Sequence, residues 1–259
     1  MDNRFPHVDY DFVAETYNQR FIDNTSDPTR EALLSLVDCY HAKTILELGC
    51  GTGHWLSVRR NFGLTLYGAD FSYGMLAQAQ LREGSFHLVQ TPAEKLPFAH
   101  NNFDLIICVN AVHHFNNPKE FIQESYCTIQ PGGRIAILGR DPHRNDDQWY
   151  IYEYFDHVCQ NDFMRFTPWK QLIEWMEATG FRNIHIAPIG RIVADKIGRS
   201  VLEDPYLKKN ATSQLILVSD ADYTAGIAKI QTALQEAEDQ GRNLVFPVEL
   251  TLEMIIGQK

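Results

Sequence analysis

Three glycines crowd a five-residue stretch of the chain directly after an apolar run. In the segment TILELGCGTGHW, residues 44–55, they are Gly49, Gly51 and Gly53. A glycine-rich turn between a strand and a helix exposes backbone N–H groups and lets a ligand lie against the main chain. The spacing therefore indicates a site for a nucleotide-type ligand.

Two acidic residues and one histidine narrow the choice of ligand. His54 takes the place of the third glycine in the dinucleotide fingerprint G-x-G-x-x-G. Asp70 ends the next apolar run, where a carboxylate can accept hydrogen bonds from both ribose hydroxyls. Glu47 precedes the loop, and its carboxylate would repel a pyrophosphate but suits a cationic amino group. These residues favour a cofactor that carries adenosine, an ammonium group and a sulfonium group.

The elements that must position these residues alternate between two hydrophobic periods. Short apolar runs bounded by turn residues are typical of strands that are covered on both faces. Segments with apolar residues at helical spacing lie between them. This alternation predicts a parallel sheet with helices on both faces, and ligands bind beyond the carboxyl ends of such strands. The predicted strands cover residues 44–48, 64–69, 86–89, 103–109 and 134–138.

Capping residues mark where several predicted helices begin and end. Ser72 can cap one helix, and Asn117 before a proline can start another. Thr167 as N-cap, Pro168 in the first turn and Gly180 at the end bracket a further helix. One more helix is predicted within a polar and charged segment, at 222–240, and a last strand at 244–256. We expect four parts: an N-terminal cap helix region (1–28), a core (29–190), a helical lid insertion (191–243) and the final core strand (244–259).

Composition excludes several classes of protein. A net charge of −10 and a pI near 5.4 argue against a nucleic-acid partner, because phosphate binding needs clustered Lys and Arg. The five scattered cysteines form no C-x-x-C pair, so neither a disulfide framework nor a metal site is predicted. The first residues, MDNRFPHVDYDF, have neither the basic nor the apolar region of a leader, so none is expected, and no apolar run approaches the ~20 residues that span a bilayer. We expect a cytoplasmic protein with a small-molecule partner; monomer and homodimer both remain open.

At the glycine loop the sequence resembles the class I S-adenosylmethionine-dependent methyltransferases, in particular the subfamily that contains ubiquinone and menaquinone biosynthesis methyltransferases. ILELGCGTG is a full match to the cofactor loop of that family. The resemblance covers residues 10–190 and implies a Rossmann-like, doubly wound α/β fold. It also implies a mostly parallel seven-stranded sheet, S-adenosylmethionine as cofactor and S-adenosylhomocysteine as product. Four further blocks follow in the family's order: GADFS (68–72), AEKLPF (93–98), FDLIICVNAVHHF (103–115) and QPGGR (130–134).

The resemblance also implies contacts for each part of the cofactor. The first-strand acid and the loop hold the methionine amino group, while the second-strand acid holds the ribose. Pro92 departs from the family, because many relatives carry Asp there to accept from the adenine amino group. Adenine recognition is therefore expected to use backbone groups or Glu94. The implied cofactor-binding residues are Tyr17, Arg20, Glu47, Gly49, Gly51, Gly53, Asp70, Phe71, Met75, Ala93, Glu94 and Asn110.

Four side chains near the predicted reaction centre are candidates for a general base. His113 and His114 follow the fourth strand, and Asp141 and His143 follow the fifth and compete for the same task. A base matters only for a hydroxyl or carbon-acid acceptor, so the histidines can equally shape the pocket floor. The aromatic residues of 149–175 suit an apolar or planar substrate, and they can also dock a helix on the sheet.

The predicted function is methyl transfer from S-adenosylmethionine, by in-line displacement, to an O, N or C nucleophile of a small and partly apolar metabolite. Two other classes stay open. One is a dinucleotide-dependent oxidoreductase on a similar sheet, against which His54 and Glu47 argue. The other is a non-catalytic methyltransferase homologue that only binds the cofactor.

Overall fold

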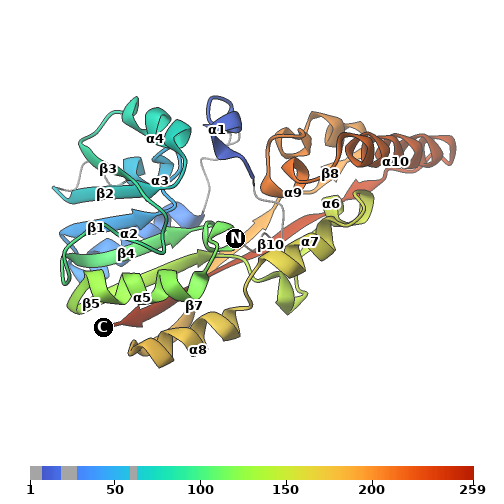
Figure 1. Ribbon diagram of the computed structural model, residues 1–259. Coiled ribbons are helices and arrows are strands. Elements are labelled where there is room, and N and C mark those ends of the chain that lie inside the picture. The colour runs from blue at the N-terminus through green and yellow to red at the C-terminus, as the bar shows by residue number, and fades with distance from the viewer. Residues whose placement is uncertain (1–7, 19–27, 59–62) are drawn as a thin grey trace.

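A twisted sheet of eight strands forms the centre of the computed structural model, which describes residues 8–18, 28–58 and 63–259 (Figure 1). The strand order is β3-β2-β1-β4-β5-β10-β6, with β7 also paired to β10. The first five strands are parallel to their neighbours, whereas β10 is antiparallel to β5, β6 and β7. The strands are β1 (Thr44–Leu48), β2 (Thr65–Asp70), β3 (Phe86–Gln90), β4 (Phe103–Val109), β5 (Ile129–Gly139), β6 (Gln148–Trp149), β7 (Arg182–Val193) and β10 (Val248–Gln258).

The predicted mostly parallel sheet is confirmed, and β1, β4 and β5 carry most of its buried side chains, whereas the edge strand β3 has no fully buried residue. Seven strands are long, and the eighth, β6, is a two-residue pairing at the amino-terminal end of β10. The five predicted core strands all form, with ends that differ by a few residues. Each carries side chains into both faces of the sheet, which explains why they read as nearly continuous apolar runs.

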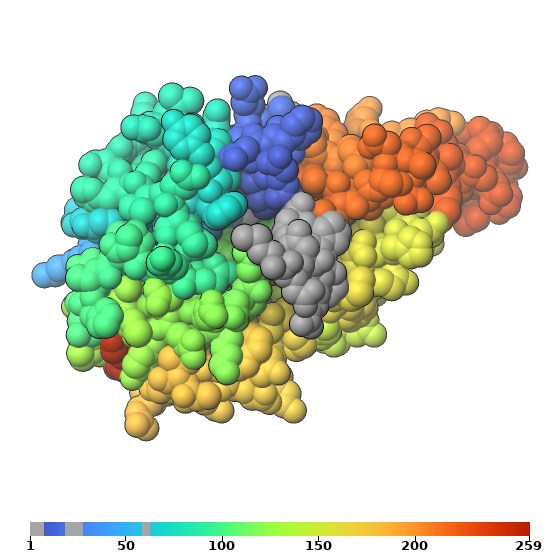
Figure 2. All heavy atoms as spheres, viewed as in Figure 1, coloured from blue at the N-terminus to red at the C-terminus, as the bar shows by residue number. Residues whose placement is uncertain are grey.

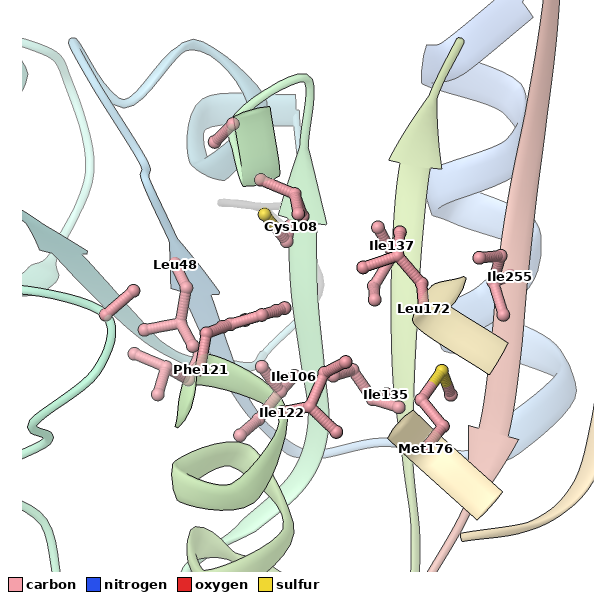
Figure 3. Packing of buried hydrophobic residues seen from close by; sticks show 14 of the residues in the cluster. Leu48, Ile106, Cys108, Phe121, Ile122, Ile135, Ile137, Leu172, Met176 and Ile255 are labelled. Carbon is pink, nitrogen blue, oxygen red and sulfur yellow. The ribbon is translucent and has the colours of Figure 1, made fainter. Parts of the chain in front are cut away.

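Helices cover both faces of the sheet, and each face has its own hydrophobic cluster. On one face, α5 (Pro118–Thr128) and α8 (Trp169–Thr179) pack on the sheet. Figure 3 shows Phe121 and Ile122 of α5 and Met176 of α8 directed at the strands. The opposite face is covered by α2 (Pro28–Tyr40), α3 (His54–Val58) and α4 (Tyr73–Gln80).

Three of the four predicted capping residues act as expected. Ser72 Oγ accepts from the Met75 N–H at 3.0 Å, Asn117 caps α5, and Gly180 ends α8 in the left-handed region, at φ +116°. Thr167 as N-cap of α8 is wrong. Pro168 itself keeps an extended backbone, with ψ 139°, so it takes the cap position and the helix begins one residue later than expected, at Trp169.

The predicted last strand is divided in two by a proline. Pro247 has no N–H to donate, so the strand stops at β9 (Val245–Phe246) and resumes as β10. Opposite it, β7 gives way to β8 (Lys196–Ile197), which pairs with β9. The pairing register does not shift across the break, because Ile192 faces Leu250 and Lys196 faces Phe246. The two segments therefore form one antiparallel ribbon that extends beyond the sheet.

A cap surrounds the outer end of this ribbon (Figure 1). Its own hydrophobic cluster combines residues from 149–158 with residues from 201–248. The helix predicted at 222–240 is confirmed as α10, whose N-cap is Ser219. The proposed lid segment, 191–243, thus shares the cap with residues that precede β7. The helices are α6 (Tyr150–Tyr154), α7 (Val158–Arg165), α9 (Ser213–Ile216) and α10 (Asp220–Asp239).

A short N-terminal helix, α1 (Tyr10–Val13), lies between the core and the cap (Figure 2). Asp11 ties it to the core, because its carboxylate accepts from Ser72 Oγ and from the Gly74 N–H, both at 2.6 Å. These hydrogen bonds lower the pKa of Asp11. On the cap side, Asn210 Nδ2 donates to Thr16 Oγ1 at 3.1 Å. The N-terminal segment 8–18, which includes α1, therefore contacts both halves of the molecule. Within the described residues, the structure contains no helix with the length and apolar character of a bilayer-spanning segment.

Candidate functional site

A cavity of about 500 Å³ lies beyond the carboxyl ends of β1, β2 and β4. Helix α1 borders it, and the glycine loop and the start of α4 form much of its wall. This is the edge at which the parallel sheet was expected to bind a ligand. The predicted cofactor residues that line it are Tyr17, Gly49, Gly51, Asp70, Phe71, Met75, Ala93, Glu94 and Asn110.

Two glycines of the loop are required by its geometry. Gly49 has φ +69°, and a Cβ built on it would lie 2.4 Å from the Cβ of Ala111, so no side chain fits there. Gly51 has φ +52° and lines the cavity, and a Cβ on it would meet no protein atom within 4 Å. A ligand can therefore approach the backbone at Gly51 more closely than it could approach a residue with a side chain.

Asp70 is placed to bind a ligand and to hold the loop at once. One carboxylate oxygen accepts from the Gly51 N–H at 2.7 Å and the other from the Ser72 N–H at 2.9 Å. Burial raises the pKa of Asp70, although these donors oppose the shift. A carboxylate offers about four lone-pair sites, so two remain for ribose hydroxyls. Its geometry and its position on the cavity wall fit the predicted role.

The residues that are predicted to contact the adenine differ in how deeply they are buried. Phe71 is 74% exposed, whereas Met75 is 1% exposed and also packs in a small cluster with α1. Glu94 lines the cavity, and its Oε1 accepts from the Asn117 N–H at 3.0 Å. One Glu94 oxygen is therefore occupied by a helix start, and the other remains for a ligand.

Three predicted cofactor residues are not brought to this cavity surface by the described structure. Glu47 is 1% exposed within β1 and is not among the described lining residues. Gly53 faces α4, where a Cβ would lie 3.1 Å from Ala79 Cβ. Arg20 lies outside the described residues. Contact of Glu47 and Arg20 with a cofactor stays a prediction, while Gly53 has a packing reason to be glycine.

A second cavity of about 420 Å³ adjoins the first and extends toward the cap. Residues that line both include Tyr10, Tyr17, Gly49, Asn110 and His114. The aromatic residues of 149–175 serve two purposes: some line this cavity and others fill the hydrophobic core of the cap. Trp149 and Phe166 line this cavity, whereas Tyr150 and Phe155 are buried in the cap core.

Of the two predicted histidines, only His114 lies where the cavities meet. His114 lines both cavities, and its Nε2 lies 2.7 Å from the Tyr10 hydroxyl oxygen. His113 lines the second cavity and stacks on Phe166 with ring centroids 3.9 Å apart. A general base must reach the nucleophilic atom of the acceptor beside the methyl donor, so a residue at this boundary is better placed than one in a single cavity, and His114 is the better-placed candidate.

Asp141 and His143, the other two predicted bases, have structural partners instead. The Asp141 carboxylate accepts from the N–H of His143 at 3.1 Å and of Trp169 at 3.0 Å, so it caps the start of α8. His143 Nε2 lies 2.8 Å from the Phe166 carbonyl oxygen. Neither is among the described residues lining the two cavities. The geometry therefore assigns them to positioning the loop after β5.

Sequence reasoning missed a buried charge network behind the second cavity. Arg140 lines the cavity and forms ion pairs with Asp147 at 2.8 Å and with Asp162 at 3.5 Å. Burial alone would lower the pKa of Arg140, but the neighbouring Tyr152, Asp147 and Asp162 together raise it. The sequence signal was only an arginine after a strand, because its partners lie in other elements.

Comparison with known proteins places this site in a family. Residues 46–137 match the family model described as "Methyltransferase domain". A malonyl-[acyl-carrier protein] O-methyltransferase of Enterobacter lignolyticus is 31% identical over 107 residues, 41% of this chain and 43% of that protein. A protein of the same name from Marinomonas sp. is 26% identical over 88% of this chain and 84% of its own length. Other curated relatives are named demethylmenaquinone methyltransferase and tRNA U34 carboxymethyltransferase.

The extent of these matches differs between sequence and structure. The chain spans less than half the length of the first curated relatives that it matches. A solved structure, Haemonchus contortus phosphoethanolamine N-methyltransferase 2 in complex with S-adenosyl-L-methionine, has a TM-score of 0.60 at 18% identity. It covers 99% of this chain and 58% of that one, which shows a common fold. The match of residues 46–137 to a methyltransferase domain, the common fold and the glycine-loop cavity agree in supporting a class I S-adenosylmethionine-dependent methyltransferase of the ubiquinone and menaquinone biosynthesis kind.

Proposed function

We propose that this protein transfers a methyl group from S-adenosylmethionine in the first cavity to a small, partly apolar acceptor in the second. The observation that carries the proposal is the meeting of the two cavities at Tyr10, Asn110 and His114. Bound S-adenosylmethionine supplies an electrophilic methyl group on a sulfonium. The chain's own task is to hold an acceptor in line with that group and to exclude water from both.

The residues of the first cavity fit this cofactor. Asp70 supplies ionised acceptor atoms for ribose hydroxyls, and Gly51 leaves open space against the backbone. Phe71 and Met75 supply apolar contact for the adenine. Pro92 lies in the wall at the position where relatives carry Asp, so backbone groups and the second Glu94 oxygen are left for the adenine amino group.

The second cavity has the character of a small-molecule site. A volume of about 420 Å³ lies within the usual range for such pockets, roughly 300–1,000 Å³. Its wall includes apolar side chains from the ribbon and aromatic side chains such as Trp149 of β6 and Phe166. A tRNA acceptor, suggested by the names of some relatives, is disfavoured by the net charge of −10.

Calorimetric titration with S-adenosylmethionine, S-adenosylhomocysteine and NADH tests the cofactor. We expect micromolar binding of the first two and no binding of NADH, because the loop has no third dinucleotide glycine. NADH binding would favour the oxidoreductase alternative and would contradict the proposal. A screen of apolar acids, phenols and amines for S-adenosylhomocysteine release then separates an enzyme from a non-catalytic homologue.

The two histidines are distinguished by substitution once a hydroxyl or carbon-acid acceptor is found. His114→Gln is expected to lower kcat by about 10²–10⁴-fold, the usual contribution of a general base. His113→Gln, the matched control, removes a ring that reaches only the second cavity, and we expect a clearly smaller loss. Both kcat values are measured from initial rates at saturating cofactor. Equal losses of kcat in the two variants would contradict the assignment of His114 as the general base.

A further inference from the structure

The second cavity has an apolar floor made by the antiparallel ribbon of β7–β8 and β9–β10. Residues directly opposite each other in such a ribbon project from the same face, and alternate residues along each strand do so as well. Ile192 faces Leu250 and Lys196 faces Phe246 in one unshifted register. One face of the ribbon thus carries Leu252, Leu250, Val248, Ile192, Ala194 and Lys196, and all of them line the cavity.

This floor leads from the reaction centre to a lysine. The near end lies beside the carboxyl end of β5, because Glu253 pairs with Gly139, and Gly139 lies against Asn110. The far end is reached four residues beyond Ile192, a distance of at most ~13 Å in extended chain. Lys196 therefore lies at the cap end of this apolar floor, away from the glycine loop.

The charge of Lys196 has no partner within the described residues. No hydrogen bond or ion pair of its ammonium group is formed there. The other cation of the cavity, Arg140, is balanced by Asp147 and Asp162. The acid of the cavity, Asp204, is held by other groups, since its oxygens accept from the Tyr150 hydroxyl at 2.9 Å and the Tyr206 N–H at 3.0 Å.

We infer that Lys196 binds a carboxylate at the end of the acceptor remote from its methyl-accepting atom. One lysine without an internal partner matches a single negative charge, and the apolar floor matches the body between that charge and the nucleophile. Polar side chains of the cap, such as Tyr206 and Ser213, also line this cavity. The inference rests on the proposed function, because it names the class of acceptor for the second cavity: an amphipathic carboxylic acid.

Decanoate is a suitable probe, because it combines an apolar chain with a terminal carboxylate. It is titrated calorimetrically into protein saturated with S-adenosylhomocysteine, which keeps the first cavity filled. Decanol and decyl phosphate are compared with it. We expect decanoate to bind tightest, and Lys196→Met to weaken it by about 10- to 100-fold while leaving decanol within twofold. Lys196→Arg should retain most of the decanoate affinity.

A matched control is Lys208→Met, an exposed lysine of the same cap that is not among the lining residues. It should leave all affinities unchanged. The inference is overturned if decanoate does not bind, if decanol binds as well, or if the two methionine variants behave alike. Tighter binding of decyl phosphate would overturn the choice of a carboxylate. Saturation with S-adenosylhomocysteine is established first, so a failed subsite is distinguished from a failed methyltransferase assignment.

Discussion

Replacing Asp70 with alanine is expected to weaken S-adenosylhomocysteine binding by about 10²–10⁴-fold. The reason is the loss of two hydrogen bonds from ribose hydroxyls to a charged acceptor, each contributing roughly 1.5–3 kcal/mol. The same carboxylate holds the loop through the Gly51 and Ser72 N–H groups. Calorimetric titration of the purified variant measures the change, and wild-type affinity in Asp70→Ala would contradict the assignment of the first cavity.

Asp104 offers a matched control for this variant. It is also an aspartate whose carboxylate accepts from two backbone N–H groups, those of Lys43 and Thr44, both at 2.8 Å. It lies near the amino-terminal end of β4, at the opposite edge of the sheet from the glycine loop. Asp104→Ala should therefore disturb the fold to a similar degree without changing cofactor affinity.

Lowering the pH should have the same direction of effect as the substitution. Ribose hydroxyls donate to the ionised carboxylate, and burial raises the pKa of Asp70 in the free protein. Protonation therefore competes with binding at a higher pH than it would for an exposed aspartate. The affinity for S-adenosylhomocysteine should fall as the pH is lowered toward the raised pKa, and Asp70→Ala should lack this dependence.

The parts of the site that were predictable depend on local sequence. The glycine loop, the acid at the end of β2 and the apolar strands each follow from residues that are close along the chain, and the structure places them as expected. Their positions relative to one another follow from the parallel sheet, whose carboxyl ends share one edge. The position of the first cavity could therefore be anticipated, although Glu47 and Gly53 do not line it.

The second cavity could not be anticipated, because its wall combines distant segments. The unshifted register that brings Lys196 opposite Phe246 depends on a pairing across about fifty residues of chain, and the break at Pro247 hides its continuity. Asp141 and His143 show a second difficulty for prediction from sequence. A polar residue after a strand is as useful for capping the next helix as for catalysis, and only the positions of α8 and Phe166 decide between the two.

The largest effect on stability is expected for Asp162, which lies at the centre of the buried network. Its side chain is 1% exposed and forms ion pairs with Arg140 and Arg165, which are 10% and 5% exposed. It also accepts from the Tyr152 hydroxyl at 2.6 Å and from Gln214 Nε2 at 2.9 Å. Asp162→Ala leaves two buried guanidinium groups without this partner, so the free energy of unfolding should fall by about 3–5 kcal/mol.

Urea denaturation followed by circular dichroism measures this loss, and a surface pair in the same part of the molecule controls for it. Asp156 pairs with Lys229 of α10 at 2.7 Å, but both side chains are largely exposed, so Asp156→Ala should leave the midpoint almost unchanged. If the two variants have the same free energy of unfolding, the buried network does not stabilise the fold more than the surface pair does. Since Asp162 is not among the described residues lining the first cavity, folded Asp162→Ala should still bind S-adenosylhomocysteine. A stability loss with cofactor binding retained would show that the network supports the fold without forming part of the cofactor site.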